Sequence, residues 1–218
     1  MLSFDNVSAV KAFISEEKIE YINFFLGDID GRLRSVSIPA ETYSEKIMER
    51  GIGFDASNFG FAEVDRSDKI LKPDLGYAFI DPIEEDPRVL CFFCNMLEVD
   101  SNARFTQDLR HLVPQTLKLM EAEGVADSAR VGVELEFHVV DQLFSVRTPR
   151  EQSFRVETSE MVSPPGGEES YRIAPKRGYF RAEPNDHLFS IRSEIVSIYR
   201  EPVSYTHLTL PTTWSRCR

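Results

Sequence analysis

Two carboxylates at alternate positions are the residues of this sequence that point most directly to chemistry. Glu134 and Glu136 lie in the run Val131-Gly132-Val133-Glu134-Leu135-Glu136-Phe137. On a β-strand, residues two apart project from the same face, so a strand here would present both carboxylates side by side. Adjacent carboxylates repel each other, and Mg²⁺ or Mn²⁺, which prefer hard oxygen ligands, would remove that repulsion. Taken alone, such a pair is more often a solvated acidic face.

Two further segments carry candidate site residues. Asp55 lies in Phe54-Asp55-Ala56-Ser57-Asn58, at the start of a stretch over residues 53–75 with little periodicity, which we expect to be a loop. A loop of this length inside a compact domain is usually functional. Tyr179 lies in Lys176-Arg177-Gly178-Tyr179-Phe180.

The elements that must position these residues divide near residues 100–102, where the composition shifts. Before that point we expect a helix over residues 7–17, strands over 21–26 and 33–38, a helix over 42–50, and strands over 77–80 and 89–97. Asp30-Gly31 predicts a hairpin turn between the first two strands, because glycine accepts a positive φ. The first unit should therefore be mostly β.

The second unit is predicted to mix helices and strands. Thr106 can cap a helix that Pro114 kinks or restarts and that Gly124 ends. A strand over residues 131–140 should carry the two glutamates, an exposed polar loop should cover 145–170, and a helix should cover 186–200.

Composition and charge exclude several classes of protein. The 218 residues carry a formal net charge of −11, which argues against binding to nucleic acid or to anionic membranes. No apolar run approaches the ~20 residues of a membrane span, and no signal peptide is recognisable. Three cysteines make no disulfide framework, so we expect a reducing, cytoplasmic location. Cys91 and Cys94 form an isolated C-x-x-C pair, which we interpret as part of an apolar strand.

Residues 203–218 differ from the rest of the chain. They contain no Asp or Glu, although the whole chain has 36, and they include the single Trp. Residues 203–212 resemble the translated read-through of a transposase adapter used in sequencing libraries. We therefore expect 203–218 to be a non-native tail and the native chain to be interrupted near Glu201.

The order and spacing of these motifs resemble the glutamine synthetase family. The resemblance rests on Phe54 to Asn58, on Ser67-Asp68 and Pro73-Asp74, on the Glu134/Glu136 strand and on Lys176 to Phe180, and it extends from about residue 20 to 200. It implies an α+β protein: a β-grasp-like domain over residues 16–101, followed by the beginning of a catalytic domain over 102–201 that is incomplete.

The resemblance also implies roles for individual residues. Glu134 and Glu136 would hold the two divalent ions, Mg²⁺ or Mn²⁺, that flank the phosphoryl group transferred from ATP. Tyr179 would line the pocket for ammonium. Asp55, supplied by a neighbouring subunit, would complete that pocket, so the protein would be a homo-oligomeric ring with shared active sites.

The implied reaction is glutamine formation from glutamate, ammonia and ATP through γ-glutamyl phosphate. Ala56, Asn58 and Arg177 depart from the family pattern, so a γ-glutamyl ligase for another amine, such as a polyamine, remains an alternative. A non-catalytic structural or regulatory homologue is another. The family's remaining metal ligands and nucleotide-binding arginines would follow residue 201, so we expect the 218-residue chain to be inactive alone.

Overall fold

A computed structural model describes residues 1–59, 67–83, 86–130, 137–158, 181–182, 184 and 186–200. The chain divides into two compact units, built mainly of residues 1–131 and 132–196, and each is described by itself. Glu134, Glu136, Tyr179 and the tail over 203–218 lie outside the described residues.

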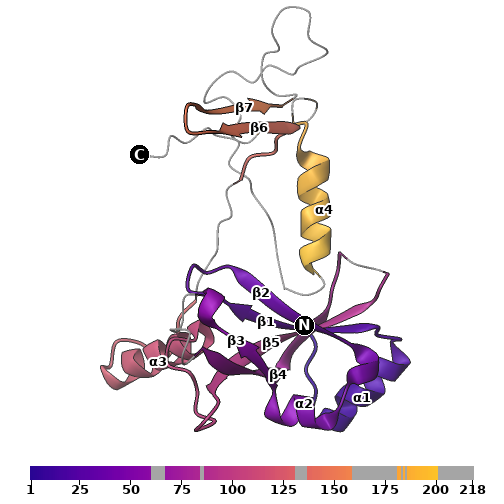
Figure 1. Ribbon diagram of the computed structural model, residues 1–218, viewed down its shortest axis with the longest axis vertical. Helices are drawn as coiled ribbons and strands as arrows, with labels where there is room; N and C mark the ends of the chain where they lie inside the picture. The colour runs from indigo at the N-terminus through magenta and orange to yellow at the C-terminus, as the bar shows by residue number, and fades with distance from the viewer. Residues whose placement is uncertain are drawn as a thin grey trace, which may run out of the picture. The chain divides into compact units, whose positions relative to one another are not determined.

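The first unit is built on a mixed five-stranded sheet (Figure 1). Its strands follow the order β2-β1-β5-β4-β3, in which β1 and β5 are parallel and the other neighbours antiparallel. The strands are β1 (Tyr21–Gly27), β2 (Leu33–Pro39), β3 (Ile52–Asp55), β4 (Asp68–Ile80) and β5 (Val89–Glu98). The unit also contains helices α1 (Val7–Glu16), α2 (Glu45–Arg50) and α3 (Leu109–Ala122) and the 3-10 turns η1 (Ala40–Thr42) and η2 (Ser57–Phe59). This mixed sheet with its helices confirms the predicted α+β class.

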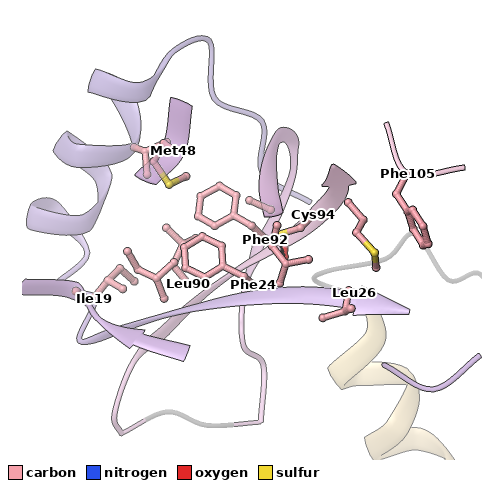
Figure 2. Packing of buried hydrophobic residues seen from close by; sticks show 14 of the residues in the cluster. Ile19, Phe24, Leu26, Met48, Leu90, Phe92, Cys94 and Phe105 are labelled. Carbon is pink, nitrogen blue, oxygen red and sulfur yellow. Dashed lines mark hydrogen bonds between the residues drawn. The ribbon is translucent and has the colours of Figure 1, made fainter. Parts of the chain in front are cut away.

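The hydrophobic core lies between the sheet and helices α1 and α2. Phe24 of β1 and Phe92 of β5 are opposite each other in the parallel register, and their rings stack with centroids 6.4 Å apart. Both are fully buried, as is Val10 of α1, and Met48 of α2 is 2% exposed. Figure 2 shows the two phenylalanines side by side at the centre of this cluster. Burying each such ring stabilises the fold by about 1.5–3 kcal/mol.

Capping and turn residues mark where several elements of the first unit begin and end. Asn6 caps α1 by accepting the Ala9 N–H, and Gly31 adopts φ +78° in the hairpin turn. Gly51, which ends α2, adopts φ +84°. A Cβ on Gly51 would also lie 2.4 Å from the Leu71 carbonyl oxygen, so only glycine fits this position.

The expected loop over residues 53–75 is wrong for most of the described part of that range. β3 extends to Asp55, η2 follows it, and β4 begins at Asp68, nine residues before the predicted strand. Lys69, Leu71 and Pro73 occupy successive buried positions of β4. Because lysine and proline stand at two of these positions, the alternation of the strand is invisible in a hydrophobicity pattern.

Helix α3 (Leu109–Ala122) differs from the prediction at its start. Asp108, not Thr106, caps it by accepting the Arg110 N–H. Pro114 lies inside the helix without ending it, and Gly124, at φ +66°, follows its last turn as predicted.

The second unit contains a hairpin where an exposed loop was expected. β6 (Gln142–Arg147) and β7 (Gln152–Glu157) pair antiparallel, so the loop prediction over 145–170 is wrong there. Every β6 side chain is exposed, so β6 has no buried face that would require alternating apolar residues in the sequence. Residues 137–140 belong to no strand, while the rest of the predicted strand over 131–140 lies outside the described residues. Helix α4 (Phe189–Arg200) confirms the helix predicted over 186–200.

Candidate functional site

Asp55 is the predicted site residue whose surroundings the structure describes. It is the last residue of β3, an edge strand, and its side chain is exposed. Its Oδ1 accepts the Ser57 backbone N–H at 2.9 Å. Hydrogen bonds from the Ser57 backbone and hydroxyl and from the Ser67 hydroxyl hold the pKa of Asp55 below its usual value, against a smaller opposing effect of burial. Asp55 is thus an accessible, permanently ionised carboxylate at neutral pH.

A second carboxylate lies opposite Asp55 on the neighbouring strand. Asp68, the first residue of β4, is its register partner, and both side chains are exposed. Directly paired residues of antiparallel strands project from the same face, so both negative charges lie on one face of this sheet corner. Like charges opposite each other are unfavourable, and a cation bound between or beside them would relieve that repulsion.

The surroundings of Ala56, one of the departures from the family pattern, explain how alanine fits at this position. Ala56 is fully buried, and its N–H donates to the Ser67 carbonyl oxygen at 2.9 Å. A methyl group in place of glycine therefore fits a closed apolar position and leaves the backbone link to β4 intact. Asn58, the second departure, has a side chain outside the described part of the structure.

Glu134, Glu136 and Tyr179 lie outside the described residues, so their predicted roles stay predictions. Among the residues that the structure does describe, no three His, Cys, Asp or Glu side chains form a group able to hold a metal ion. His138, two residues after Glu136 in the sequence, is exposed.

The cysteine pair of β5 behaves as predicted for an apolar strand. Cys91 is fully buried and Cys94 is 1% exposed, and both thiols are free. Burial raises the pKa of Cys91 to about 12, and it also raises the pKa of Cys94.

Sequence reasoning missed the serines that hold Asp55 in place. Ser57 closes an Asp-x-Ser turn on the carboxylate, a local signal that could have been found, because aspartate often accepts the N–H two residues ahead. Ser67 lies twelve residues away, and only the pairing of β3 with β4 brings it to Asp55.

The sequence of this chain matches two profiles of one protein family and several curated relatives. The family profile described as "Glutamine synthetase, beta-Grasp domain" matches residues 18–99, and "Glutamine synthetase, catalytic domain" matches residues 106–205. A glutamine synthetase of Aquifex aeolicus is 32% identical over 190 residues, covering 85% of this chain and 40% of the relative. One from Cereibacter sphaeroides is 30% identical over 193 residues, covering 84% and 40%. The chain therefore spans about 40% of the length of these curated relatives.

A solved structure agrees with these matches at the level of the fold. The cryo-EM structure of Plasmodium falciparum glutamine synthetase superposes with a TM-score of 0.75 at 18% identity, covering 93% of this chain and 41% of that one. None of the helices in the described part of the chain is both long and apolar enough to cross a membrane.

Proposed function

The chain belongs to the glutamine synthetase family, and we propose that it forms part of an ATP-dependent ligase that joins glutamate to ammonia through γ-glutamyl phosphate. One observation carries this proposal. The two domain profiles of the family match this chain one after the other, the β-grasp profile over residues 18–99 and the catalytic profile over residues 106–205. The Asp55 carboxylate, exposed and ionised at the sheet edge, adds chemical support for this proposal, because it can attract a cation such as ammonium.

Asp55 suits the binding of a small cation better than strong base catalysis. The hydrogen bonds from Ser57 and Ser67 that hold its pKa low keep it charged, and the same shift makes it a weak proton acceptor. Together with the Asp68 carboxylate, it would attract ammonium to the sheet edge. Proton removal would then depend on a stronger base or on water, because ammonia, not ammonium, is the nucleophile.

We assign the metal ligands of the reaction to Glu134 and Glu136. Their carboxylate oxygens are the hard donors that Mg²⁺ or Mn²⁺ prefer, but two residues fill only part of an octahedral shell. Such ions neutralise charge that develops on a transferring phosphoryl group. The other ligands and the nucleotide site would come from sequence that the relatives have and this chain does not match, so the chain alone should be inactive.

The direct test is an assay of product formation. The protein extended to the length of its relatives should form glutamine from glutamate, ATP and ammonium, and the 218-residue chain should form none at any Mg²⁺ or Mn²⁺ concentration. Turnover by the chain alone would refute the proposed incompleteness.

The main competing function is a γ-glutamyl ligase that uses an amine other than ammonia. Asn58, three residues after Asp55, departs from the family pattern, and this departure is the reason to keep a γ-glutamyl ligase for a larger amine as the alternative. Parallel assays with ammonium and with putrescine would separate the two ligases. Absence of product with every amine tested would instead favour a non-catalytic homologue.

We further propose that Asp55 acts in the active site of a neighbouring subunit within a ring. Such a head-to-tail contact closes into a ring when its rotation permits. Mixing an Asp55→Ala protein with a Glu136→Ala protein, both at full relative length, should restore part of the activity that each lacks alone. Mixed rings without restored activity would show that Asp55 serves its own domain instead.

A further inference from the structure

A buried carboxylate anchors the hairpin turn between β1 and β2. Asp28 is 2% exposed, and its Oδ1 accepts the Asp30 N–H at 3.0 Å and the Arg32 N–H at 2.8 Å. Its Oδ2 accepts from Arg34 Nε at 2.7 Å. This carboxylate is thus paired with a cation and hydrogen-bonded through both oxygens, the condition under which a buried charge is tolerated.

Arg34 links this anchored turn to the loop that carries Asp55, residues 55–59. While its Nε donates to Asp28, its guanidinium carbon lies 5.8 Å from the centroid of the Phe59 ring. Within about 6 Å of an aromatic face, a guanidinium is attracted to the ring. Because Asp28 holds the guanidinium, Arg34 offers the Phe59 ring a contact at a fixed place beside the hairpin turn.

Phe59 is also held from two other sides. Its ring packs against Phe54 of β3 with centroids 5.8 Å apart, and its carbonyl oxygen accepts the Ile29 N–H in a long hydrogen bond of 3.4 Å. Its own N–H donates to the Ala56 carbonyl oxygen at 3.1 Å. Phe59, at the end of the Asp55 loop, is therefore held against the β1–β2 turn, while Asp55, at its start, belongs to β3.

The loop follows β3 at one edge of the sheet, and its far end contacts the turn that leads into β2 at the other edge. β2 is one edge strand and β3 is the other, so the contact of Phe59 with the β1–β2 turn is not a consequence of strand pairing. We propose that Asp28 and Arg34, acting through Phe59, are positioning residues that set where the Asp55 carboxylate lies. The claim that these residues affect catalysis rests on the proposed function. The claim that they hold the Asp55 loop in place does not.

Hydrogen exchange of the 218-residue chain tests the structural part. Arg34→Ala should speed exchange at the Ser57 and Phe59 amides by about tenfold, since a hydrogen bond to a charged group and a ring contact are both lost. The core amide of Phe92 should change by less than about twofold. An equal increase at all three amides would mean that Arg34 only stabilises the domain, and would overturn the proposal.

Two further variants sharpen the result. Arg32→Ala removes the same charge from an exposed side chain of the same turn and should leave the loop amides unchanged. Phe59→Leu keeps the Asp28–Arg34 pair but removes the ring, and should reproduce the faster exchange at Ser57 even if Arg34→Ala does not fold. Unchanged Ser57 exchange in Phe59→Leu would overturn the linkage.

The catalytic part needs the protein at the length of its relatives. Arg34→Ala should raise the KM for ammonium by about tenfold while kcat falls much less, because Asp55 would be misplaced for binding the cation. A wild-type KM for ammonium alongside faster loop exchange would overturn the catalytic role. If the unsubstituted protein forms no glutamine, the proposed function fails, and the exchange data still decide the positioning.

Discussion

Removal of the Asp108 carboxylate should destabilise the first unit more than any surface substitution near it. Asp108 is 4% exposed and accepts three hydrogen bonds at 3.0 Å, from the backbone N–H groups of Met96 and Arg110 and from Arg104 Nη2. It thereby joins the end of β5 to the start of α3. We expect Asp108→Ala to break all three contacts at once.

The magnitude follows from what each donor loses. The Met96 N–H is buried and would remain unsatisfied, at a cost of about 1–3 kcal/mol. Loss of the helix cap at Arg110 costs about 1 kcal/mol. The Arg104 side chain is 33% exposed and can turn to water, so its ion pair adds less than about 1 kcal/mol. The expected loss for Asp108→Ala is therefore about 3 kcal/mol, and Asp108→Asn, which keeps one oxygen, should lose less.

Urea denaturation of the 218-residue chain measures this loss. The midpoint should fall while the slope m stays constant, because the surface exposed on unfolding is unchanged. Asp100→Ala is the matched control, since Asp100 is exposed in the preceding turn. If Asp108→Ala and Asp100→Ala lose the same free energy, within about 0.5 kcal/mol, water replaces the carboxylate and the reasoning is refuted.

Three other predictions concern the same unit. Gly51→Ala should cost more than about 2 kcal/mol in urea denaturation, because a Cβ would meet the Leu71 carbonyl oxygen at 2.4 Å and φ is +84°, whereas Gly53→Ala, with no atom within 4 Å, should cost little; similar losses would contradict this. A disulfide reagent at about pH 8 should modify at most one of the three cysteines in the native chain and all three in urea, because burial raises the pKa of Cys91 to about 12 and also raises that of Cys94; two fast native thiols would contradict it. Burial raises the pKa of Asp28, but hydrogen bonds from Arg34, Arg32 and Asp30 lower it more, so its folded value lies below the unfolded value of about 4. Its stabilising contribution should be complete above about pH 5 and lost as the pH falls through the folded pKa, so Asp28→Asn should flatten the decline of the urea midpoint in acid; a parallel decline would contradict it.

Much of the first unit could be predicted from local patterns. The strands β1 and β2 alternate side chains over a few residues, and Asp30-Gly31 supplies the positive φ of the turn between them. The motifs around Asp55, Glu134 and Tyr179 were enough to identify the family, because the order of several weak motifs is specific even when each alone is not. These features depend on neighbours in sequence or on residue type.

The elements that sequence reasoning missed depend on distant partners. β4 is a strand because β3 and β5 flank it, although Lys69 and Pro73 stand at its buried positions. Asp108 and not Thr106 caps α3, and Asp108 also accepts the Met96 N–H of β5 twelve residues away.

The surroundings of Asp55 divide in the same way. Residue type and spacing determined that a carboxylate followed by a serine begins this segment, and the turn closed by Ser57 is local. The tertiary structure alone decided that Ser67 also reaches the carboxylate and that Arg34, from the opposite edge of the sheet, packs on Phe59. The physical reason is that hydrogen bonds and ring contacts act over a few ångströms in space, and the folding of the sheet, not the spacing along the chain, determines which residues come within that range.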